Sequence, residues 1–300
     1  MDSLPTAPSL LSALPLDPIS PRLPIEEPFT PAMAARAGTG RAVLDRLHRE
    51  GRVRRLLRGV YLDGTVPLST TVRAQALGLV VGARQVVVGV TAAWLHGVEV
   101  PRPGPEAVVP IEVHGRGRHL GRPVRYAGHD LMTVEGVACT TPLRTALDLG
   151  RQLGPDRAIA ALDGFLRLGG FPYPALVAEL PRFGGQHGIV QLRELAAVAD
   201  ARADGAAESV LRLRWLHARL PTPTPGLVVP GGHRLALALE SHRFGAVLAG
   251  RLPDPALGVL ATQGWRVVVL TPARVLGGDP AFLTGHLERE FHQYLLEQVG

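Results

Sequence analysis

Side chains that could bind phosphate groups are concentrated in one short window of this 300-residue chain. Residues 31 to 60 hold eight arginines against two acidic residues, Asp45 and Glu50, so the window carries a charge of +6. The whole chain also carries a formal charge of +6, and the other residues therefore balance to zero. A positive charge confined to one segment is typical of an element that binds nucleic acid. The eight arginines are Arg36, Arg41, Arg46, Arg49, Arg52, Arg54, Arg55 and Arg58.

Other candidates for chemistry are sparse. Cys139 is the single cysteine, which excludes an intrachain disulfide and a cysteine-based zinc site, and a buried structural thiol is the simpler interpretation. The histidines show no HExxH pattern or paired spacing typical of a metal site, and no nucleotide-binding glycine loop occurs. We therefore expect neither metal nor cofactor. Arg144 and Asp148, four residues apart, predict an ion pair on one helix rather than a catalytic couple, and Asp163 could extend that set.

The elements that must position the arginines are two short helices. Thr30 can cap a helix that begins at Pro31, where the missing N–H costs nothing, and Gly38 can end it. A second helix is predicted from Arg41 to Glu50 and stops at Gly51. Its apolar residues fall on one side at helical spacing and its charged residues on the other. The apolar set is Val43, Leu44 and Leu47, and the charged set is Arg41, Asp45, Arg46 and Arg49.

A hairpin follows the second helix. Residues 52 to 62 have strand-like sequences on both sides of Arg58 and Gly59, which predicts a two-stranded wing. Together the two helices and the hairpin predict a winged helix-turn-helix that binds double-stranded DNA. Phosphate contacts would orient it, whereas the start of the second helix would reach base edges. The predicted contact residues are Thr39, Arg41, Asp45, Arg46, Arg49, Arg52, Arg54, Arg55 and Arg58, with Ala42 also at a base edge.

A solvated arginine face is the alternative interpretation of this window. All 32 basic side chains of the chain are arginine, which GC-rich codon usage would produce without selection for binding. Only the clustering of the arginines therefore counts toward nucleic-acid binding. No apolar run reaches the ~18 residues of a membrane helix, and the first basic residue is Arg22, so neither a membrane span nor a secretory signal is expected. We expect a cytoplasmic protein.

The chain as a whole is predicted to be an α+β multidomain protein. Its parts are a proline-rich irregular leader at 1–28, the winged helix at 29–64, a mixed α/β domain at 65–198 and a last domain at 199–300. In the third part the sequence predicts a helix at 71–82, a buried strand at 85–90 and a short helix that starts at Thr91. Strands are predicted at 108–114, 123–126 and 132–138, and helices after Thr141 and from 155 to 168. In the last part it predicts a helix at 206–219, strands at 226–229, 233–240, 244–249 and 264–270, and a closing helix at 279–298.

Several phrases, in their order along the chain, resemble the AbiEi-like antitoxins of type IV toxin–antitoxin systems. The opening of the resemblance is FTPAMAARAGTGRAVLDRLHREGRVRRLLRGVYL at 29–62. The middle matches VTAAWLHGV at 90–98, VACTTPLRTALDLGRQLG at 137–154 and AIAALDGFLRLGG at 158–170. The resemblance implies a repressor that binds its own promoter. It also implies opposition to a nucleotidyltransferase-like toxin encoded nearby, without a need for direct contact.

Residues 206 to 275 look like a second family, the Vsr-like endonuclease-fold domain, a restriction-endonuclease-like α/β fold. GWRVVVLTPARV at 264–275 is similar to its last core strand and the loop after it. The sequence departs from that family where the family places its catalytic carboxylates. Those positions hold Arg212, Ala236, Val247 and Ala249. Such nucleases bind Mg²⁺ through carboxylate oxygens, so the resemblance implies a fold without its active site and a protein that is not an enzyme.

Two alternatives for this last part stay open. The first is a DNA endonuclease with a shifted acidic site around Glu208 and Glu240, which lie near the expected positions. The second is a module for protein interaction or dimerisation.

Overall fold

The computed structural model of the chain describes residues 26–102, 108–115 and 126–299, together with residue 23. The predicted leader at 1–28 and the predicted strand at 123–126 lie almost entirely outside the described residues. Helices and several small sheets make an α+β chain of more than one part, in agreement with the predicted class. The chain divides into two compact units, residues 1–67 and 68–300. No helix within the described ranges is long and apolar enough to cross a membrane.

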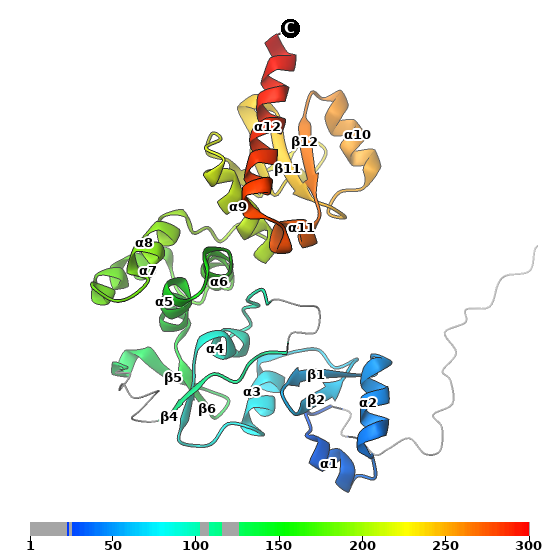
Figure 1. Cartoon of the computed structure of the whole chain (residues 1–300), viewed down its shortest axis with the longest axis vertical. Coiled ribbons are helices and arrows are strands. Elements are labelled where there is room, and N and C mark those ends of the chain that lie inside the picture. Colours follow the sequence, from blue (N-terminus) through cyan, green and yellow to red (C-terminus); the bar gives the residue numbers. More distant parts are fainter. Residues whose placement is uncertain (1–22, 24–25, 103–107, 116–125, 300) are drawn as a thin grey trace, which may run out of the picture. The chain divides into compact units, whose positions relative to one another are not determined.

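The first unit has two helices followed by an antiparallel hairpin (Figure 1). These elements are α1 (Pro31–Arg36), α2 (Arg41–Arg49), β1 (Val53–Leu57) and β2 (Val60–Asp63). The predicted caps are confirmed: the Thr30 hydroxyl accepts a hydrogen bond from the Met33 N–H at 3.3 Å, and Gly38 has φ +89°. Phe29 pairs with Tyr61 through two backbone hydrogen bonds of 2.9 Å. One buried apolar cluster of the unit consists of Phe29, Ala34, Leu44, Leu47, Val53 and Tyr61.

The second unit begins with a four-stranded sheet in the order β4-β3-β6-β5, in which β3 and β6 are parallel. Its elements are α3 (Thr70–Gly78), β3 (Gln85–Val87), α4 (Gly89–Leu95), β4 (Val113–Gly115), η1 (Gly128–Asp130), β5 (Leu131–Val134) and β6 (Val137–Thr140). A bundle follows the sheet, formed by α5 (Pro142–Gln152), α6 (Pro155–Arg167), α7 (Tyr173–Glu179), η2 (Leu180–Phe183) and α8 (Ile189–Val198). Figure 1 shows α5 and α6 side by side, and their buried leucines and Phe165 share one core.

Several sequence predictions in this region were wrong in detail. The strand predicted at 85–90 ends at Val87, and the strand predicted at 108–114 begins only at Val113. The strand predicted at 132–138 is a hairpin, because Glu135 and Gly136 adopt positive φ angles of 46° and 81° and reverse the chain. The helix predicted to start at Thr91 begins at Gly89, and Thr91 lies buried inside it. The Thr91 hydroxyl donates to the Pro110 carbonyl at 2.5 Å and accepts from the Glu112 N–H at 2.8 Å, so it anchors the next segment instead of capping a helix. The helix predicted at 71–82 ends at Gly78.

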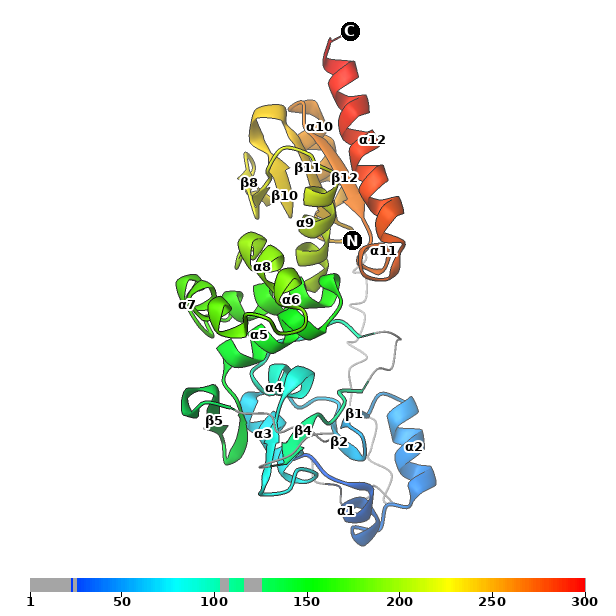
Figure 2. The same cartoon turned by 60° about the vertical axis from the view of Figure 1, so that its left-hand side comes forward.

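The last part of the chain is a second four-stranded sheet, in the order β12-β11-β10-β7, between helices. Its elements are α9 (Ala206–His217), β7 (Thr224–Pro225), β8 (Val228–Val229), β9 (His233–Arg234), β10 (Leu237–Leu239), η3 (Glu240–His242), β11 (Phe244–Leu248), α10 (Asp254–Thr262), β12 (Arg266–Leu270), α11 (Pro272–Gly277) and α12 (Pro280–Val299). Figures 1 and 2 show α9 and α12 on one face of this sheet and α10 on the other. Alternate residues of the strands therefore enter two cores, with Phe244 in one and Val247 in the other.

Helix α9 also belongs to the core of the preceding bundle. Its Leu213 is packed with the apolar residues of α5, α6 and α8. On the same helix, Arg214 forms an ion pair with Asp156 at the start of α6. One helix thus faces two cores, the bundle and the second sheet.

Candidate nucleic-acid interface and a buried arginine network

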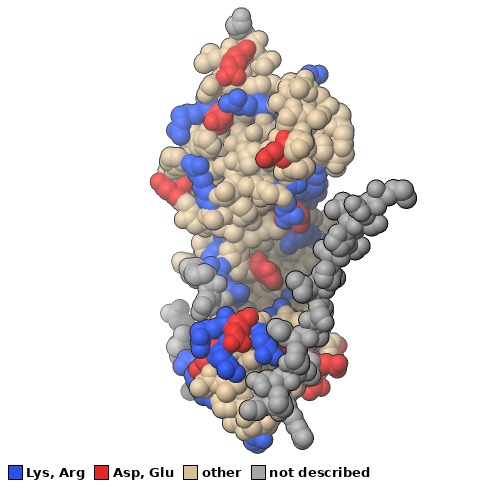
Figure 3. Space-filling view, turned by 90° about the vertical axis from the view of Figure 1, so that its right-hand side faces the viewer, with Lys and Arg blue, Asp and Glu red and all other residues tan. Residues whose placement is uncertain are grey.

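The exposed side of α2 presents charged side chains in two rows. Asp45 lies one turn after Arg41, and the Arg41 Nε atom is 3.8 Å from a carboxylate oxygen of Asp45. In the neighbouring row, the Arg46 Nε atom is likewise 3.8 Å from a carboxylate oxygen of Glu50. The arginine side chains of these two pairs are 79% and 61% exposed. Figure 3 shows arginines gathered around acidic groups on this face. The opposite side of α2 buries Leu44 and Leu47, as the spacing predicted.

The hairpin and the turn before it extend the exposed basic surface. Arg52, Arg55 and Arg58 are exposed, as is Arg49 at the end of α2. Arg54 differs from its neighbour Arg55, because its guanidinium donates a hydrogen bond to the Val66 carbonyl and is only half-exposed. Six of the seven arginines predicted to contact DNA are therefore exposed. We call this set of six, Arg41, Arg46, Arg49, Arg52, Arg55 and Arg58, the arginine surface.

Thr39 does not belong to that surface. Its side chain is 2% exposed, and within the described part of the chain its hydroxyl has no hydrogen-bond partner. The Thr39 N–H donates to the Ala34 carbonyl at 2.8 Å, so the residue closes the turn between α1 and α2. A side chain buried in a turn cannot reach a base edge in this conformation, which removes Thr39 from the predicted contacts.

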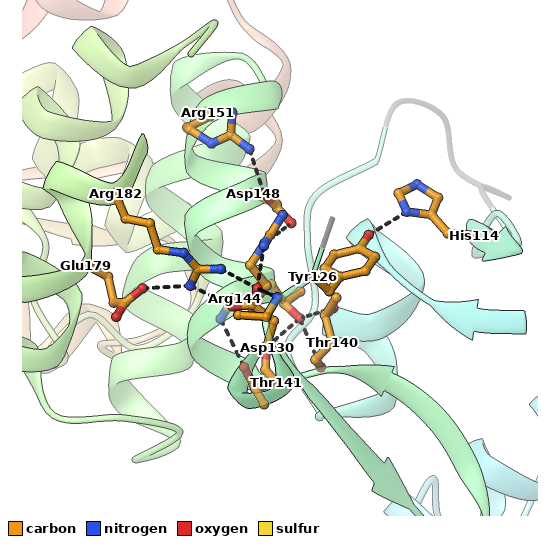
Figure 4. Close-up of polar contacts among 12 residues, drawn as sticks. His114, Tyr126, Asp130, Thr140, Thr141, Arg144, Asp148, Arg151, Glu179 and Arg182 are labelled. Atoms are coloured by element: carbon orange, nitrogen blue, oxygen red, sulfur yellow. Dashed lines mark hydrogen bonds and ion pairs between the residues drawn. The ribbon is translucent and has the colours of Figure 1, made fainter. Parts of the chain in front are cut away.

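A second polar cluster, in the larger unit, is built around the buried residues Asp130, Arg144, Asp148 and Arg151, with the partly exposed side chain of Arg182 at its edge (Figure 4). Asp130 accepts hydrogen bonds from Arg144 Nη1 and Arg182 Nη1, each at 2.8 Å, and from Arg182 Nη2. Asp148 accepts from Arg144 Nε at 2.8 Å and from Arg151 Nη2 at 2.7 Å. Asp130 is 2% exposed and the Arg144 side chain 8%. The predicted Arg144–Asp148 pair thus exists, as part of a larger buried network.

The network joins the first sheet to the bundle. Asp130 immediately precedes β5, the arginines at 144 and 151 project from α5, and Arg182 comes from η2. Arg182 also pairs with Glu179 at 2.9 Å, so three arginines face three carboxylates and the charges cancel. The ring of Phe183 is 2% exposed and lies under all three guanidinium groups, at 4.7 to 5.5 Å. Charged groups are tolerated in a protein interior only when they are paired and hydrogen-bonded to this extent. The arrangement therefore fits a structural role, in which the network holds the first sheet and the bundle together.

Asp130 holds its charge inside the protein. Burial alone would raise the pKa of this carboxyl group, but hydrogen bonds from Arg182 and the Ala127 N–H and the charge of Arg144 outweigh it. The net result is a pKa below the ordinary aspartate value. Sequence spacing could have indicated Arg151, three residues after Asp148 on the same helix. Asp130 and Arg182 come from distant segments, and no sequence signal points to them.

Comparison with known proteins places the network inside a described family. Residues 85–198 match the model of the AbiEi antitoxin C-terminal domain. The chain belongs to the AbiEi antitoxin family. Two similar proteins, both described as uncharacterized, come from the CDC 1551 / Oshkosh and H37Rv strains of Mycobacterium tuberculosis. Each is 30% identical over 239 residues, which cover 72% of this chain and 86% of the relative. Membership of this generally non-enzymatic family indicates an antitoxin role in a toxin–antitoxin system and a toxin as partner.

The position expected to hold a nuclease carboxylate on α9 instead links the tail to the AbiEi-matching region. Arg212 is 4% exposed, and its Nη2 atom is 2.5 Å from a carboxylate oxygen of Asp163 on α6. Its Nη1 atom donates to the Val198 carbonyl. Burial raises the pKa of Asp163, and the charge of Arg212 opposes that shift. The sequence left open that Asp163 extends the Arg144–Asp148 set, but in the structure Asp163 belongs to a separate pair with Arg212.

Two of the other expected nuclease positions, Ala236 and Val247, lie in the apolar cores on the two faces of the second sheet. Ala236 and Val247 are 1% and 2% exposed, and Ala249 is half-buried. Glu208 is 2% exposed and its carboxylate accepts hydrogen bonds from Arg234 at both oxygens, each at 2.8 Å. Glu240 is exposed in η3. Among the described residues no three histidine, cysteine or acidic side chains are placed to hold a metal ion.

Cys139 is a buried thiol on β6. Burial raises its pKa to about 12, and its sulfur lies 4.0 Å from Nε2 of His96. That histidine nitrogen is hydrogen-bonded to the Thr140 carbonyl at 2.8 Å, and burial lowers the pKa of the ring. A protonated thiol beside a neutral imidazole is a poor nucleophile, so the predicted structural role of Cys139 fits its surroundings.

Proposed function

We propose that the protein is a cytoplasmic DNA-binding transcriptional regulator, the antitoxin of a type IV toxin–antitoxin system, that represses its own promoter. The arginine surface is the observation that carries this proposal. Six exposed arginines on one small unit give it the positive charge that DNA binding requires. The proposed toxin partner is a nucleotidyltransferase-like protein encoded nearby.

In this proposal the first unit is a winged helix. The start of α2, with Arg41, Ala42 and Asp45, enters the major groove, because recognition helices contact base edges through their N-terminal residues. Arg46, Arg49 and the arginines of the turn and hairpin then meet phosphates on either side of the groove. The side-chain arrangement supports this division, since the apolar side of α2 is buried against the hairpin and only its charged side faces out.

The test is a mobility-shift titration of the full chain on the DNA upstream of its gene. Changing Arg41, Arg49 and Arg55 together to alanine should weaken binding by at least about a hundredfold near 0.1 M salt, from two lost phosphate contacts and one lost contact in the major groove. Arg84, Arg193 and Arg289, all exposed and all in the second unit, provide a matched control. Their triple alanine variant removes the same charge and should bind like the parent. Equal binding by both triple variants would refute the proposal.

For the tail we propose an endonuclease-like fold without nuclease activity. The buried Arg212–Asp163 pair and the engagement of Glu208 by Arg234 support this, because a metal ion would have to displace a guanidinium to reach either carboxylate. Incubation of the full chain with plasmid DNA and Mg²⁺ should leave the plasmid intact. Cleavage that is abolished by Glu240→Gln would instead establish the rival, a nuclease with a shifted acidic site.

A further inference from the structure

Asp45 is an anomaly on the arginine surface. It lies one helical turn after Arg41 and one turn before Arg49, so it has an arginine on each side along the same row. Its side chain is 53% exposed and its carboxylate is 3.8 Å from the Arg41 guanidinium. It is the middle residue of the nine in α2, and the proposed function places it with Arg41 and Ala42 in the major groove.

A carboxylate at this position opposes phosphate binding. Nearby phosphates repel it, and it reduces the positive charge that the arginine surface presents to them. Its pairing with Arg41 is no adequate compensation, because exposed ion pairs of this kind along a helix are weak. The position therefore needs a hydrogen-bond donor on the DNA.

The chemistry of the major groove leaves two candidate donors. A carboxylate only accepts hydrogen bonds, and the base edges there donate only through cytosine N4 and adenine N6. Adenine places its N7 acceptor beside N6, which repels a second acceptor, whereas cytosine has no acceptor on that edge beside N4. Cytosine is therefore the favoured partner of a carboxylate.

We propose that Asp45 is a specificity-determining residue that accepts a hydrogen bond from cytosine N4 and so selects a C·G pair in the operator. This inference rests on the proposed function. Most DNA sequences that compete with the operator have another base at that place, and against them the Asp45 charge acts as a repulsive element. The residue thus lowers non-specific affinity and raises discrimination at one base pair.

The experiment uses the full chain and two variants, Asp45→Asn and Glu50→Gln. Each removes one negative charge from an exposed residue of the same helix region, and Glu50 lies at the C-terminal end, away from the proposed base contacts. The probes are the upstream DNA and a set in which each base pair is replaced in turn. The parent should lose about 5- to 150-fold in affinity when one particular C·G pair is replaced.

The two variants should differ in their preference among the probes. Glu50→Gln should bind all probes somewhat more tightly and keep the parent's preference for that C·G pair. Asp45→Asn should lose the preference and favour A·T at the same place, because an asparagine amide matches adenine N6 and N7. If Asp45→Asn keeps the parent's preferences and only strengthens binding to every probe, the inference is wrong and the proposed function stands. If the parent has no preference for its upstream DNA, the proposed function fails and this inference with it.

Discussion

Arg54 and Arg55 are adjacent on β1, and replacing each with alanine should affect a different property of the protein. Arg55 is exposed, whereas Arg54 donates to the Val66 carbonyl. We expect Arg55→Ala to weaken DNA binding without loosening the hairpin. We expect Arg54→Ala to loosen the hairpin without removing a phosphate contact. Comparing the two variants separates the contribution of arginine charge to DNA binding from the contribution of an arginine hydrogen bond to the stability of the hairpin.

The expected loss of DNA affinity follows from the number of exposed arginines that meet phosphates. If five or six arginines of the arginine surface meet phosphates, the logarithm of affinity should fall with the logarithm of salt at a slope of about −5. Losing Arg55 should make that slope shallower by about 0.9 and weaken binding about eightfold at 0.1 M salt. A hydrogen bond from a charged donor contributes ~1.5–3 kcal/mol, so Arg54→Ala should speed amide exchange in β1 and β2 about 10- to 150-fold.

The assays are mobility shift across a salt series and amide hydrogen exchange in native buffer, both on the full chain. The reasoning would be refuted by a shallower salt slope for Arg54→Ala together with an unchanged slope for Arg55→Ala. Equal changes of slope in both variants would mean that DNA binding releases the Arg54 guanidinium from Val66. In that case its hydrogen bond does not fix the hairpin in the complex.

Three further outcomes concern the second unit. Asp130→Asn should lower the free energy of unfolding by ~3–5 kcal/mol, because it leaves the charge of buried Arg144 partly uncompensated. Glu179→Gln, which changes a more exposed ion pair, should lower it by less than ~1 kcal/mol. Denaturant titration measures both values. The lowered pKa of Asp130 gives stability that is present above about pH 4 and lost as the pH falls through the folded-state pKa, so acid should destabilise the parent more than Asp130→Asn. Cys139, with a pKa of about 12, should resist alkylation at pH 8 until the protein unfolds; rapid labelling of the native protein would contradict its burial.

Local chemistry made the first unit predictable from its sequence. Thr30 before Pro31, the glycines at 38 and 51, and the Arg58–Gly59 turn each act within a few residues, and all of them form where expected. The same holds for the cap at Thr141 and the helices that follow it. The hairpin turn at Glu135 and Gly136 was missed, since a non-glycine residue with positive φ is uncommon and the flanking residues fit one continuous strand.

Contacts between distant segments were not predictable in the same way. The ion pair of Arg182 with Asp130 spans 52 positions of sequence and that of Arg212 with Asp163 spans 49. Helical spacing can suggest which residues share a face, but it cannot say which of several aspartates an arginine reaches. Thr39 was misplaced for a related reason, because its burial depends on how α1 packs on α2 and not on its own side chain.

Arg212 has a consequence for how such proteins can evolve. Its guanidinium is the partner of a carboxylate in the AbiEi-matching region, and the Asp200 N–H, a second partner of that carboxylate, also lies beyond residue 198. Loss of the tail would remove both partners together with α9, and the apolar residues of α5, α6 and α8 that pack with Leu213 would then face water. Loss of the tail is therefore tolerable only after those bundle residues have become more polar. Until then this interface retains the last domain whether or not that domain still has an activity of its own.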